Sequence, residues 1–245
     1  MLNPGGFFMQ LSAPLYILKQ QAKVLARREN IPLHQALDQI ARREGFTAWS
    51  LLSAKTVSEK PTSTLFAQLR PGELVLLGSR PGQGKTLLSL DLALQTLRRG
   101  GHAAFFTLDF TRGNVIESFK TLGAELETFT DRFLLDDSDK ICAGYMIGKL
   151  ATAPAKTLVI VDYLQLLDQR RENPELMAQV QQLRSFARER QLIVVCLSQI
   201  NRSYDPEKQA VPGIEDVSLP NPLDMSLFDR MCFLHQGKMQ VIAGS

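Results

Sequence analysis

The sequence is poor in cysteine and has no long apolar run. Its cysteines are an odd number without the spacing of a metal site, and they stand among apolar neighbours at Cys142, Cys196 and Cys232. We therefore expect small core residues in a reducing compartment. No apolar stretch approaches the ~20 residues that cross a bilayer, and the first residues lack the basic start and apolar block of a signal peptide. These absences predict a cytoplasmic protein with no membrane partner.

Composition sets the class of protein and leaves the partner open. With 245 residues, of which 44% are hydrophobic and 22% charged, the chain suits one full globular domain and a small appendage. It has neither internal repeats nor low-complexity tracts. The net charge is +3, but residues 1–60 hold eight Lys/Arg against four Asp/Glu. This basic segment permits contact with nucleic acid, while a solvated helix face is the simpler interpretation.

Residues 12–54 have the pattern of three short helices. The first two begin near Pro14 and at Pro32, and "TAWSLL" opens the third. Apolar residues recur at helical spacing along the first two, at Leu15, Leu18, Ala22 and Leu25 and then at Leu33, Leu37, Ile40 and Ala41. Such a unit suits a docking module for another protein, a helix-turn-helix reader or a packing appendage. Because residues 55–64 have linker composition, we divide the chain into a helical segment, 1–60, and a second domain, 61–245.

From residue 65 onward, apolar strands alternate with helices. Strand-like runs occur at 73–79, 102–110, 132–137, 156–167 and 191–199, helical runs at 86–100, 113–122, 139–151 and 174–190, and two last strands surround a Gln-Gly turn within 230–243. Near-continuous apolar strands separated by helices are typical of an α/β fold, with helices on both faces of a mostly parallel twisted sheet. We therefore predict that fold for this domain.

The stretch "SRPGQGKT" follows the first of these strands. It fits the phosphate-loop pattern G-x-x-x-x-G-K-[ST] except at its first position, where Ser79 replaces glycine. Backbone N–H groups of such a loop converge on phosphate, and glycine matters most where the backbone passes close to it, at Gly82 and Gly84. A small residue suits position 79, so we predict an ATP-binding loop in which Lys85 reaches the β- and γ-phosphates. The predicted binding residues are Ser79, Arg80, Pro81, Gly82, Gln83, Gly84, Lys85 and Thr86.

A carboxylate at a second strand end completes the predicted site. In "LVIVDY", four apolar strand residues precede Asp162, which places this carboxylate at the strand's carboxyl end, where open α/β sheets bind ligands. Oxygen ligands suit Mg²⁺. We therefore predict that Thr86 and Asp162 hold a magnesium ion beside the phosphates.

Three stretches resemble the RecA-like ATPase core of DnaB-type replicative helicases. "RPGQGKT" is similar to the family's Arg-Pro-x-x-Gly-Lys-Thr loop, "IVDYLQLL" to its Asp-Tyr-Leu-Gln segment, and "LSQINR" to its Leu-Ser-Gln-x-Asn-Arg motif. The lead-in "LRPGELVLLGS" is also similar, and the resemblance covers about residues 65–202. The second and third motifs together are more specific than the phosphate loop alone.

The resemblance implies a RecA-like P-loop NTPase that hydrolyses ATP with Mg²⁺ and acts on single-stranded DNA. It also implies that Gln199 senses the γ-phosphate from a strand end. The family's catalytic glutamate, in a Ser-Leu-Glu-Met segment, corresponds here to Asp109 in "TLDF". The predicted catalytic residues are therefore Lys85, Asp109 and Gln199. A strand-end aspartate is also typical of a cap, here for the helix that begins near Arg112.

Other parts of the family pattern have no match in this sequence. Residues 12–54 stand in place of the family's large amino-terminal domain, and its terminal Lys-x-Arg finger has no clear counterpart beyond Lys238. We therefore expect weak or ATP-dependent self-association and little unwinding. The predicted loop 203–222 is long and net acidic, with Tyr204 as its single base-stacking candidate.

Two functions remain open at this point. The first is a DnaB-like ATPase acting on single-stranded nucleic acid. The second is a slow ATP-dependent switch that signals to a protein partner through residues 12–54. A small-molecule phosphotransferase is less well supported, because no second substrate constellation is visible.

Overall fold

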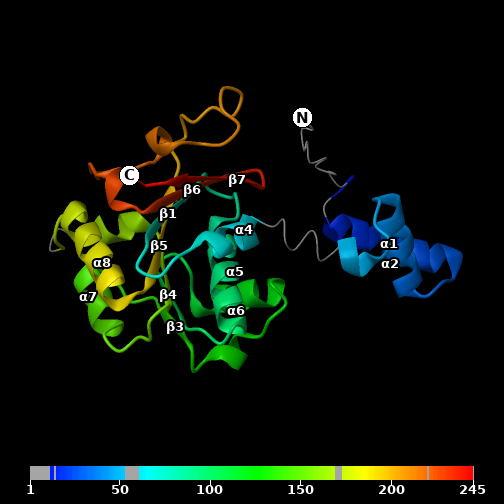
Figure 1. The fold of residues 1–245 in the computed structure, drawn as a ribbon, viewed down its shortest axis with the longest axis horizontal. Coiled ribbons are helices and arrows are strands. Elements are labelled where there is room, and N and C mark those ends of the chain that lie inside the picture. The colour runs from blue at the N-terminus through cyan, green and yellow to red at the C-terminus, as the bar shows by residue number, and fades with distance from the viewer. Residues whose placement is uncertain (1–11, 14, 53–60, 169–172, 220, 245) are drawn as a thin grey trace, which may run out of the picture. The chain divides into compact units, whose positions relative to one another are not determined.

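The chain forms two compact units, residues 1–64 and residues 65–245 (Figure 1). The computed structural model describes residues 12–13, 15–52, 61–168, 173–219 and 221–244. Among the helices of these residues, none combines the length and the apolar character that a membrane crossing requires.

The first unit contains the three predicted helices. They are α1 (Leu15–Glu29), α2 (Leu33–Arg43) and a helical turn at 49–52. Their common core consists of Leu18, Ala22, Leu25, Ala36, Ile40, Ala41 and Leu52. The predicted apolar face of the second helix is wrong at Leu33, which is 41% exposed at the start of α2. Ala36, one helical turn further on, is fully buried in the core instead.

The predicted linker is shorter than its composition indicates. Residues 53–60 lie outside the described part of the chain, but Pro61–Gln68 form helix α4. Proline suits the first turn of a helix because its φ is already helical and its missing N–H is not needed there. Thr62 and Leu65 are buried, which ties the first turns of this helix to a packed core. The linker prediction is therefore wrong over residues 61–64.

A seven-stranded sheet forms the centre of the second unit, with strand order β3-β2-β4-β5-β1-β6-β7. The strands are β1 (Leu74–Ser79), β2 (Ala103–Thr107), β3 (Phe133–Asp136), β4 (Leu158–Asp162), β5 (Ile193–Gln199), β6 (Arg230–His235) and β7 (Lys238–Ala243). All neighbours pair in parallel except β6 and β7, which form an antiparallel hairpin. The predicted, mostly parallel sheet and its closing hairpin are confirmed.

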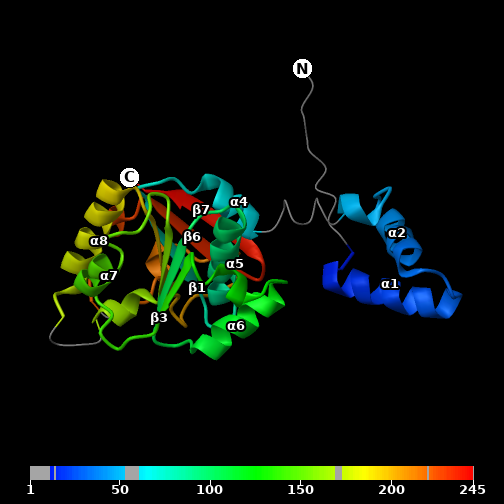
Figure 2. The same ribbon diagram turned by 90° about the horizontal axis from the view of Figure 1, so that it is seen from below.

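Helices cover both faces of this sheet (Figure 2). Helices α4, α5 (Lys85–Arg98) and α6 (Arg112–Thr121) contribute to one core, and α7 (Ala143–Lys149) and α8 (Leu176–Arg190) to the other. Alternate residues of β1 divide between the two, with Val75 and Leu77 on the α5 side and Leu74 and Leu76 on the α8 side. Because parallel strands start at one edge and end at the other, the polar residues after β1, β2, β4 and β5 lie along one edge.

The predicted strand 156–167 ends earlier, at Asp162. A short 3₁₀ helix, η2 (Leu164–Asp168), follows it. Both Leu164 and Leu167 are buried, and their spacing of three suits a helical turn. An unbroken apolar run does not distinguish a strand from such a turn.

Two of the three cysteines, Cys196 and Cys232, are buried, and burial disfavours the thiolate form. It raises the pKa of the Cys196 thiol to about 12 and that of Cys232 to about 12 as well. Cys142, directly before α7, is half-buried. The predicted core placement is therefore confirmed for two cysteines and only partly for the third.

Candidate active site

The predicted phosphate loop connects β1 to α5. Gly82 and Gly84 have φ values of 77° and 81°, in the left-handed region that favours glycine. Ser79 is fully buried at the end of β1, and its hydroxyl donates to the carbonyl of Arg80 over 3.2 Å. The glycine one position earlier, Gly78, packs against the neighbouring strand, because a Cβ there would lie 3.0 Å from Phe233 Cδ1 and 3.1 Å from Ile200 Cδ1. Serine at position 79 is therefore compatible with the loop.

Three of the predicted residues meet where β4 ends and α5 begins. Thr86 Oγ1 donates to Asp162 Oδ2 over 3.1 Å, and Lys85 Nζ lies 3.9 Å from Asp162 Oδ1. The Lys85 and Asp162 side chains are only 11% and 3% exposed. The ammonium also lies 5.5 Å from the centre of the Tyr163 ring, within the range of a cation–π contact. A cation, a hydroxyl and a carboxylate thus share one largely dehydrated site.

Burial disfavours the charged form of both partners in this pair. It lowers the pKa of Lys85, although the carboxylates of Asp162 and Asp109 partly offset the shift. It raises the pKa of Asp162, an effect that Lys85 and the Thr86 hydroxyl oppose and that Asp109 reinforces. A negatively charged ligand beside Lys85 would stabilise its ammonium form.

Asp109 lies just beyond β2, at the same edge of the sheet. Thr107, the last residue of β2, is in register with Asp162, and its Oγ1 accepts from the backbone N–H of Asp109 over 3.1 Å. The Asp109 side chain is exposed, and its charge influences both Lys85 and Asp162. The structure therefore brings this carboxylate into the neighbourhood of the other site residues.

The alternative interpretation of Asp109, as the cap of α6, is wrong. Thr111 occupies the N-cap position, where its side chain accepts from the backbone N–H of Asn114. The Asn114 side chain accepts in turn from the backbone N–H of Thr111 over 3.0 Å. This reciprocal capping leaves no helix-capping role for Asp109.

Gln199 ends β5, directly beside the phosphate loop. It is in register with Ser79 on the adjacent strand. Its side chain is half-buried, and its backbone carbonyl accepts from the N–H of Ser218 over 2.8 Å. Across the sheet edge, the order is therefore Asp109 after β2, Asp162 at β4, Gln199 at β5 and the loop at β1.

One contact to the loop was not anticipated from the sequence. The backbone N–H of Gln236, in the β6–β7 turn, donates to Gln83 Oε1 over 2.9 Å. The Gln-Gly dipeptide signals the hairpin turn, but no local pattern relates it to residues more than a hundred positions earlier. Tyr163 and Gln165 belong to the sequence motif around Asp162 without a predicted role, and both lie beside the site.

Tyr204 is not free to stack on a base. Its side chain is buried, and its hydroxyl donates to the carbonyl of Gln209 over 2.6 Å. Its ring meets the ring of His235 edge-on, at 5.4 Å between centroids. The sequence-based assignment of Tyr204 as a base-stacking candidate is therefore wrong.

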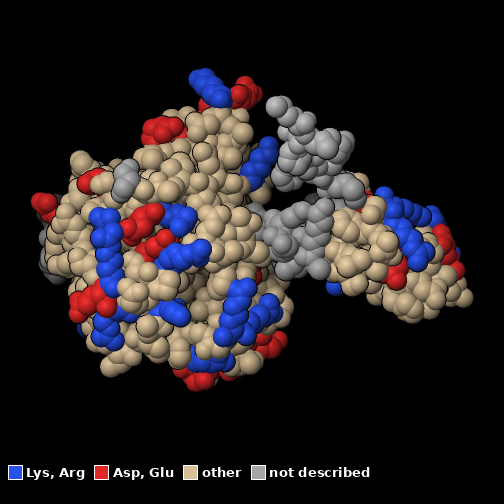
Figure 3. All heavy atoms as spheres, in the orientation of Figure 1, with Lys and Arg blue, Asp and Glu red and all other residues tan. Residues whose placement is uncertain are grey.

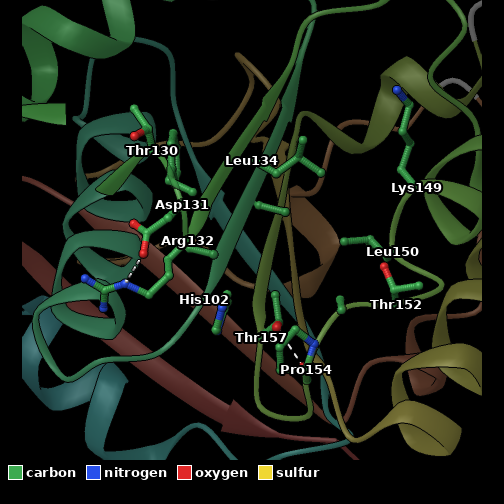
Figure 4. Close-up of a pocket in the computed structure, with 14 residues that line it drawn as sticks. His102, Thr130, Asp131, Arg132, Leu134, Lys149, Leu150, Thr152, Pro154 and Thr157 are labelled. Carbon is green, nitrogen blue, oxygen red and sulfur yellow. Dashed lines mark hydrogen bonds and ion pairs between the residues drawn. The ribbon is translucent and has the colours of Figure 1, made fainter. Parts of the chain in front are cut away.

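A separate pocket of about 320 Å³ opens at the opposite edge of the sheet (Figure 4). Residues at the starts of β2 and β3 line this pocket, together with residues that lead into β2, β3 and β4. None of the predicted site residues lines it. Arg132 pairs with Asp131 at 3.4 Å, and Thr157 Oγ1 donates to the Pro154 carbonyl over 2.7 Å. These polar side chains are therefore already paired with neighbouring residues of the chain.

Comparisons with known proteins agree with this architecture. Residues 119–238 match the family model described as the DnaB-like helicase C terminal domain. A probable plasmid replicative DNA helicase of Chlamydia psittaci is 26% identical over 202 residues, and the replicative DNA helicase DnaB of Leifsonia xyli subsp. xyli is 23% identical over 199. Each alignment covers 69% of this chain and 43% of the relative. The chain thus matches less than half the length of these relatives.

Two solved structures share the fold. One is an isolated ATPase domain, which superposes with a TM-score of 0.58 at 18% identity, covering 80% of this chain and 88% of that one. The other is a DnaB-like replicative helicase, studied for its interactions with primase, which superposes with a TM-score of 0.59 at 18% identity, covering 94% and 72%. Fold, family match and relatives together show that residues 65–245 are similar to the RecA-like ATPase core of DnaB-type replicative helicases.

Proposed function

We propose that residues 65–245 bind ATP with Mg²⁺ and hydrolyse it. The observation that carries the proposal is the cluster of Lys85, Thr86 and Asp162, with distances of 3.1 Å and 3.9 Å, directly beyond the two loop glycines with positive φ. A buried cation at a helix start suits phosphate, because the first turn of the helix also presents unpaired N–H groups.

The residues present fit a magnesium ion. Hydroxyl and carboxylate oxygens are ligands that Mg²⁺ prefers, and the ion is commonly held by one or two protein groups together with substrate phosphates. The fit rests on Thr86 Oγ1 and Asp162 Oδ2, whose oxygens already lie 3.1 Å apart. When bound, the ion would neutralise charge on the phosphates. Lys85 would hold the β- and γ-phosphates, and Asp162 would fix the ion's water shell.

We assign the hydrolytic step to Asp109 and Gln199. Asp109 would orient and deprotonate the attacking water, and Gln199 would contact the γ-phosphate from the end of β5. Both lie where strands end at the edge occupied by Lys85 and Asp162. Aspartate is one methylene shorter than the glutamate of the resembling helicases, which favours slow hydrolysis.

We further propose coupling to single-stranded DNA. The proposal rests on the fold and on relatives named as DNA helicases. Lysines, arginines and acidic residues are interspersed on the visible face of residues 65–245, so charge alone does not mark a nucleic-acid path there (Figure 3). With Tyr204 buried, phosphate contacts would have to supply more of the affinity than base stacking does.

A specific observation supports the second candidate function, a switch that signals through residues 12–54. A groove of about 530 Å³ runs between α1 and α2, lined by Gln20, Gln21, Val24, Leu25, Arg28, Ile40 and Arg43. Val24 is 64% exposed beside two arginines. An exposed apolar residue within a basic rim suits a protein partner that offers an apolar and an acidic group.

Phosphate release by the purified full chain tests these proposals. We expect Mg²⁺-dependent ATP turnover that Lys85→Ala lowers at least several-fold. Helicase-type coupling further predicts that single-stranded DNA stimulates this turnover several-fold. Sizing with and without ATP is expected to show weak or ATP-dependent self-association. No ATP binding would contradict the ATPase proposal, whereas turnover that ignores DNA would favour the switch. A stable nucleotide-free hexamer that unwinds a forked duplex would contradict the expected assembly.

A further inference from the structure

Gln165 joins three segments that meet beside the candidate active site. It lies in η2, three residues after Asp162. Its Nε2 amide donates to Ser198 Oγ over 3.2 Å and also to the main-chain carbonyl of Ser218. Ser198 directly precedes Gln199 on β5, and Ser218 belongs to the long segment that follows β5. The Gln165 carboxamide therefore connects η2, which follows Asp162, to the residue before Gln199 and to residues 213–219, which we call the distal segment.

The distal segment is added to the end of β5 as a short antiparallel extension. Ile200 and Val217 form a bridge, and the N–H of Asn201 donates to the Asp216 carbonyl over 2.7 Å. The N–H of Ser218 donates to the Gln199 carbonyl over 2.8 Å. Ser218 is thus held on its N–H side by the backbone of Gln199 and on its carbonyl side by the side chain of Gln165.

The backbone on both sides of Gln165 is held in the core. Leu164 and Leu167, on either side of it in η2, are fully buried. The Leu167 carbonyl accepts from Gln179 Nε2 on α8 over 2.6 Å. Oε1 of Gln165 is buried without a hydrogen-bond partner among the described residues. An unpaired buried acceptor costs free energy. The two hydrogen bonds that Nε2 donates offset this cost and fix the orientation of the amide.

We propose that Gln165 is a positioning residue that couples the nucleotide site to residues 213–219. This inference rests on the proposed ATPase function. A ligand that moves Asp162 or Gln199 changes the distance between η2 and the end of β5, and the Gln165 carboxamide spans that distance. Its contact with Ser218 then transmits the change to the extension, and in return the extension holds Gln199 at the γ-phosphate.

Two substitutions separate this role from simple packing. Gln165→Ala removes the carboxamide, and Gln165→Glu preserves its size while removing the amide donors. Gln182→Ala, on an exposed position of α8, is the matched control and is expected to behave like the parent. The full chain is studied by hydrogen–deuterium exchange at the Asn201 and Ser218 amides, with and without Mg²⁺ and ATPγS, and by ATP turnover.

We expect both Gln165 variants to exchange these amides about fivefold faster without ligand, the factor for loss of one neutral hydrogen bond. In the parent, we expect Mg²⁺ and ATPγS to slow this exchange, and in the variants we expect this protection to be lost. The kcat for ATP is expected to fall on the order of tenfold while ATP affinity stays within about twofold. Such a split is not expected from a residue that only supports the fold.

Two results would overturn the positioning role alone. One is ligand-free exchange at the parent rate in both variants, and the other is restored protection by ATPγS together with an unchanged kcat. Absence of ATP binding in the parent chain would overturn the proposed function, and the positioning role with it. The exchange measured without ligand therefore distinguishes the two failures.

Discussion

The Oγ1 hydroxyl of Thr86 donates a hydrogen bond to Oδ2 of Asp162 over 3.1 Å, across 76 positions of the chain. The contact joins the first turn of α5 to the end of β4. Two oxygen atoms that can serve as metal ligands are thereby held close together in the absence of an ion. Because little reorganisation would then be needed, the arrangement suits the proposed magnesium site.

Asp162→Asn is expected to weaken the effect of Mg²⁺ on ATP binding. Asparagine retains an oxygen that can accept from Thr86 but lacks the charge that orders the ion's water shell. Loss of an outer-shell partner typically costs 10- to 100-fold in metal affinity, and we expect a loss of about that size by titration calorimetry with Mg²⁺. Asp131→Asn, on a side chain that is 72% exposed, is the control. An unchanged Mg²⁺ dependence would remove Asp162 from the proposed metal site.

Lys85→Ala is expected to weaken ATP binding at least several-fold. The substitution removes a buried cation from the phosphates, and a hydrogen bond to a charged group contributes about 1.5–3 kcal/mol. Turnover should fall with affinity. Lys120→Ala, at an exposed position of α6, serves as the control. Equal ATP affinity of the Lys85 variant and the parent in calorimetry would contradict the phosphate-loop assignment.

Asp109→Glu is expected to speed ATP turnover, and Asp109→Asn to slow it without weakening ATP binding. A general base must come within about 2.6–3.2 Å of its water, and a displacement near 1 Å can cost ~100-fold in rate. The longer glutamate extends the carboxylate from the end of β2 toward that range. If Asp109→Asn hydrolyses ATP at the parent rate, the match to the family's glutamate is positional only.

Asp229→Asn is expected to destabilise the fold at neutral pH and to have less effect in acid. Burial alone would raise the pKa of Asp229, but the backbone N–H of Leu74 and the guanidinium groups of Arg188 and Arg184 together lower it. The unfolded chain therefore binds this proton more readily. The stabilisation is present above the ordinary value of 3.8 and is lost as pH falls through the lower folded pKa.

Because the Asp229 side chain is 20% exposed, we expect a loss of only about 1–2 kcal/mol in the free energy of unfolding at neutral pH. Urea titrations at neutral pH and below the ordinary carboxyl pKa measure the difference, with Asp137→Asn, at an exposed position, as the reference. A variant equally destabilised at both pH values would show that the effect does not come from ionisation.

Strand ends were the most predictable part of this molecule. Asp162 and Gln199 each follow an apolar run, and a parallel sheet brings the ends of such runs to one edge. Their neighbourhood therefore follows from local pattern and one topological rule. The same reasoning places Asp109 near them without specifying its contacts.

Contacts between distant segments were not predictable in this way. The start of α6 is an exception, because the capping box of Thr111 and Asn114 is a local contact, and it excludes Asp109 as the cap. Tyr204 stands in an acidic segment of the sequence, yet it is buried in the core that lies against α8, with the ring of His235 edge-on beside it. Periodicity describes one element at a time, whereas these outcomes depend on which elements meet.

The order of Gly78 and Ser79 bears on how phosphate loops are recognised in other sequences. At position 78 the side chains of Phe233 and Ile200 leave little room for a Cβ, so packing favours glycine there, and the serine hydroxyl at 79 donates to the Arg80 carbonyl. A search pattern that demands glycine at the first loop position therefore passes over chains of this kind. A pattern anchored instead on the two glycines with positive φ and the lysine that follows would retrieve them.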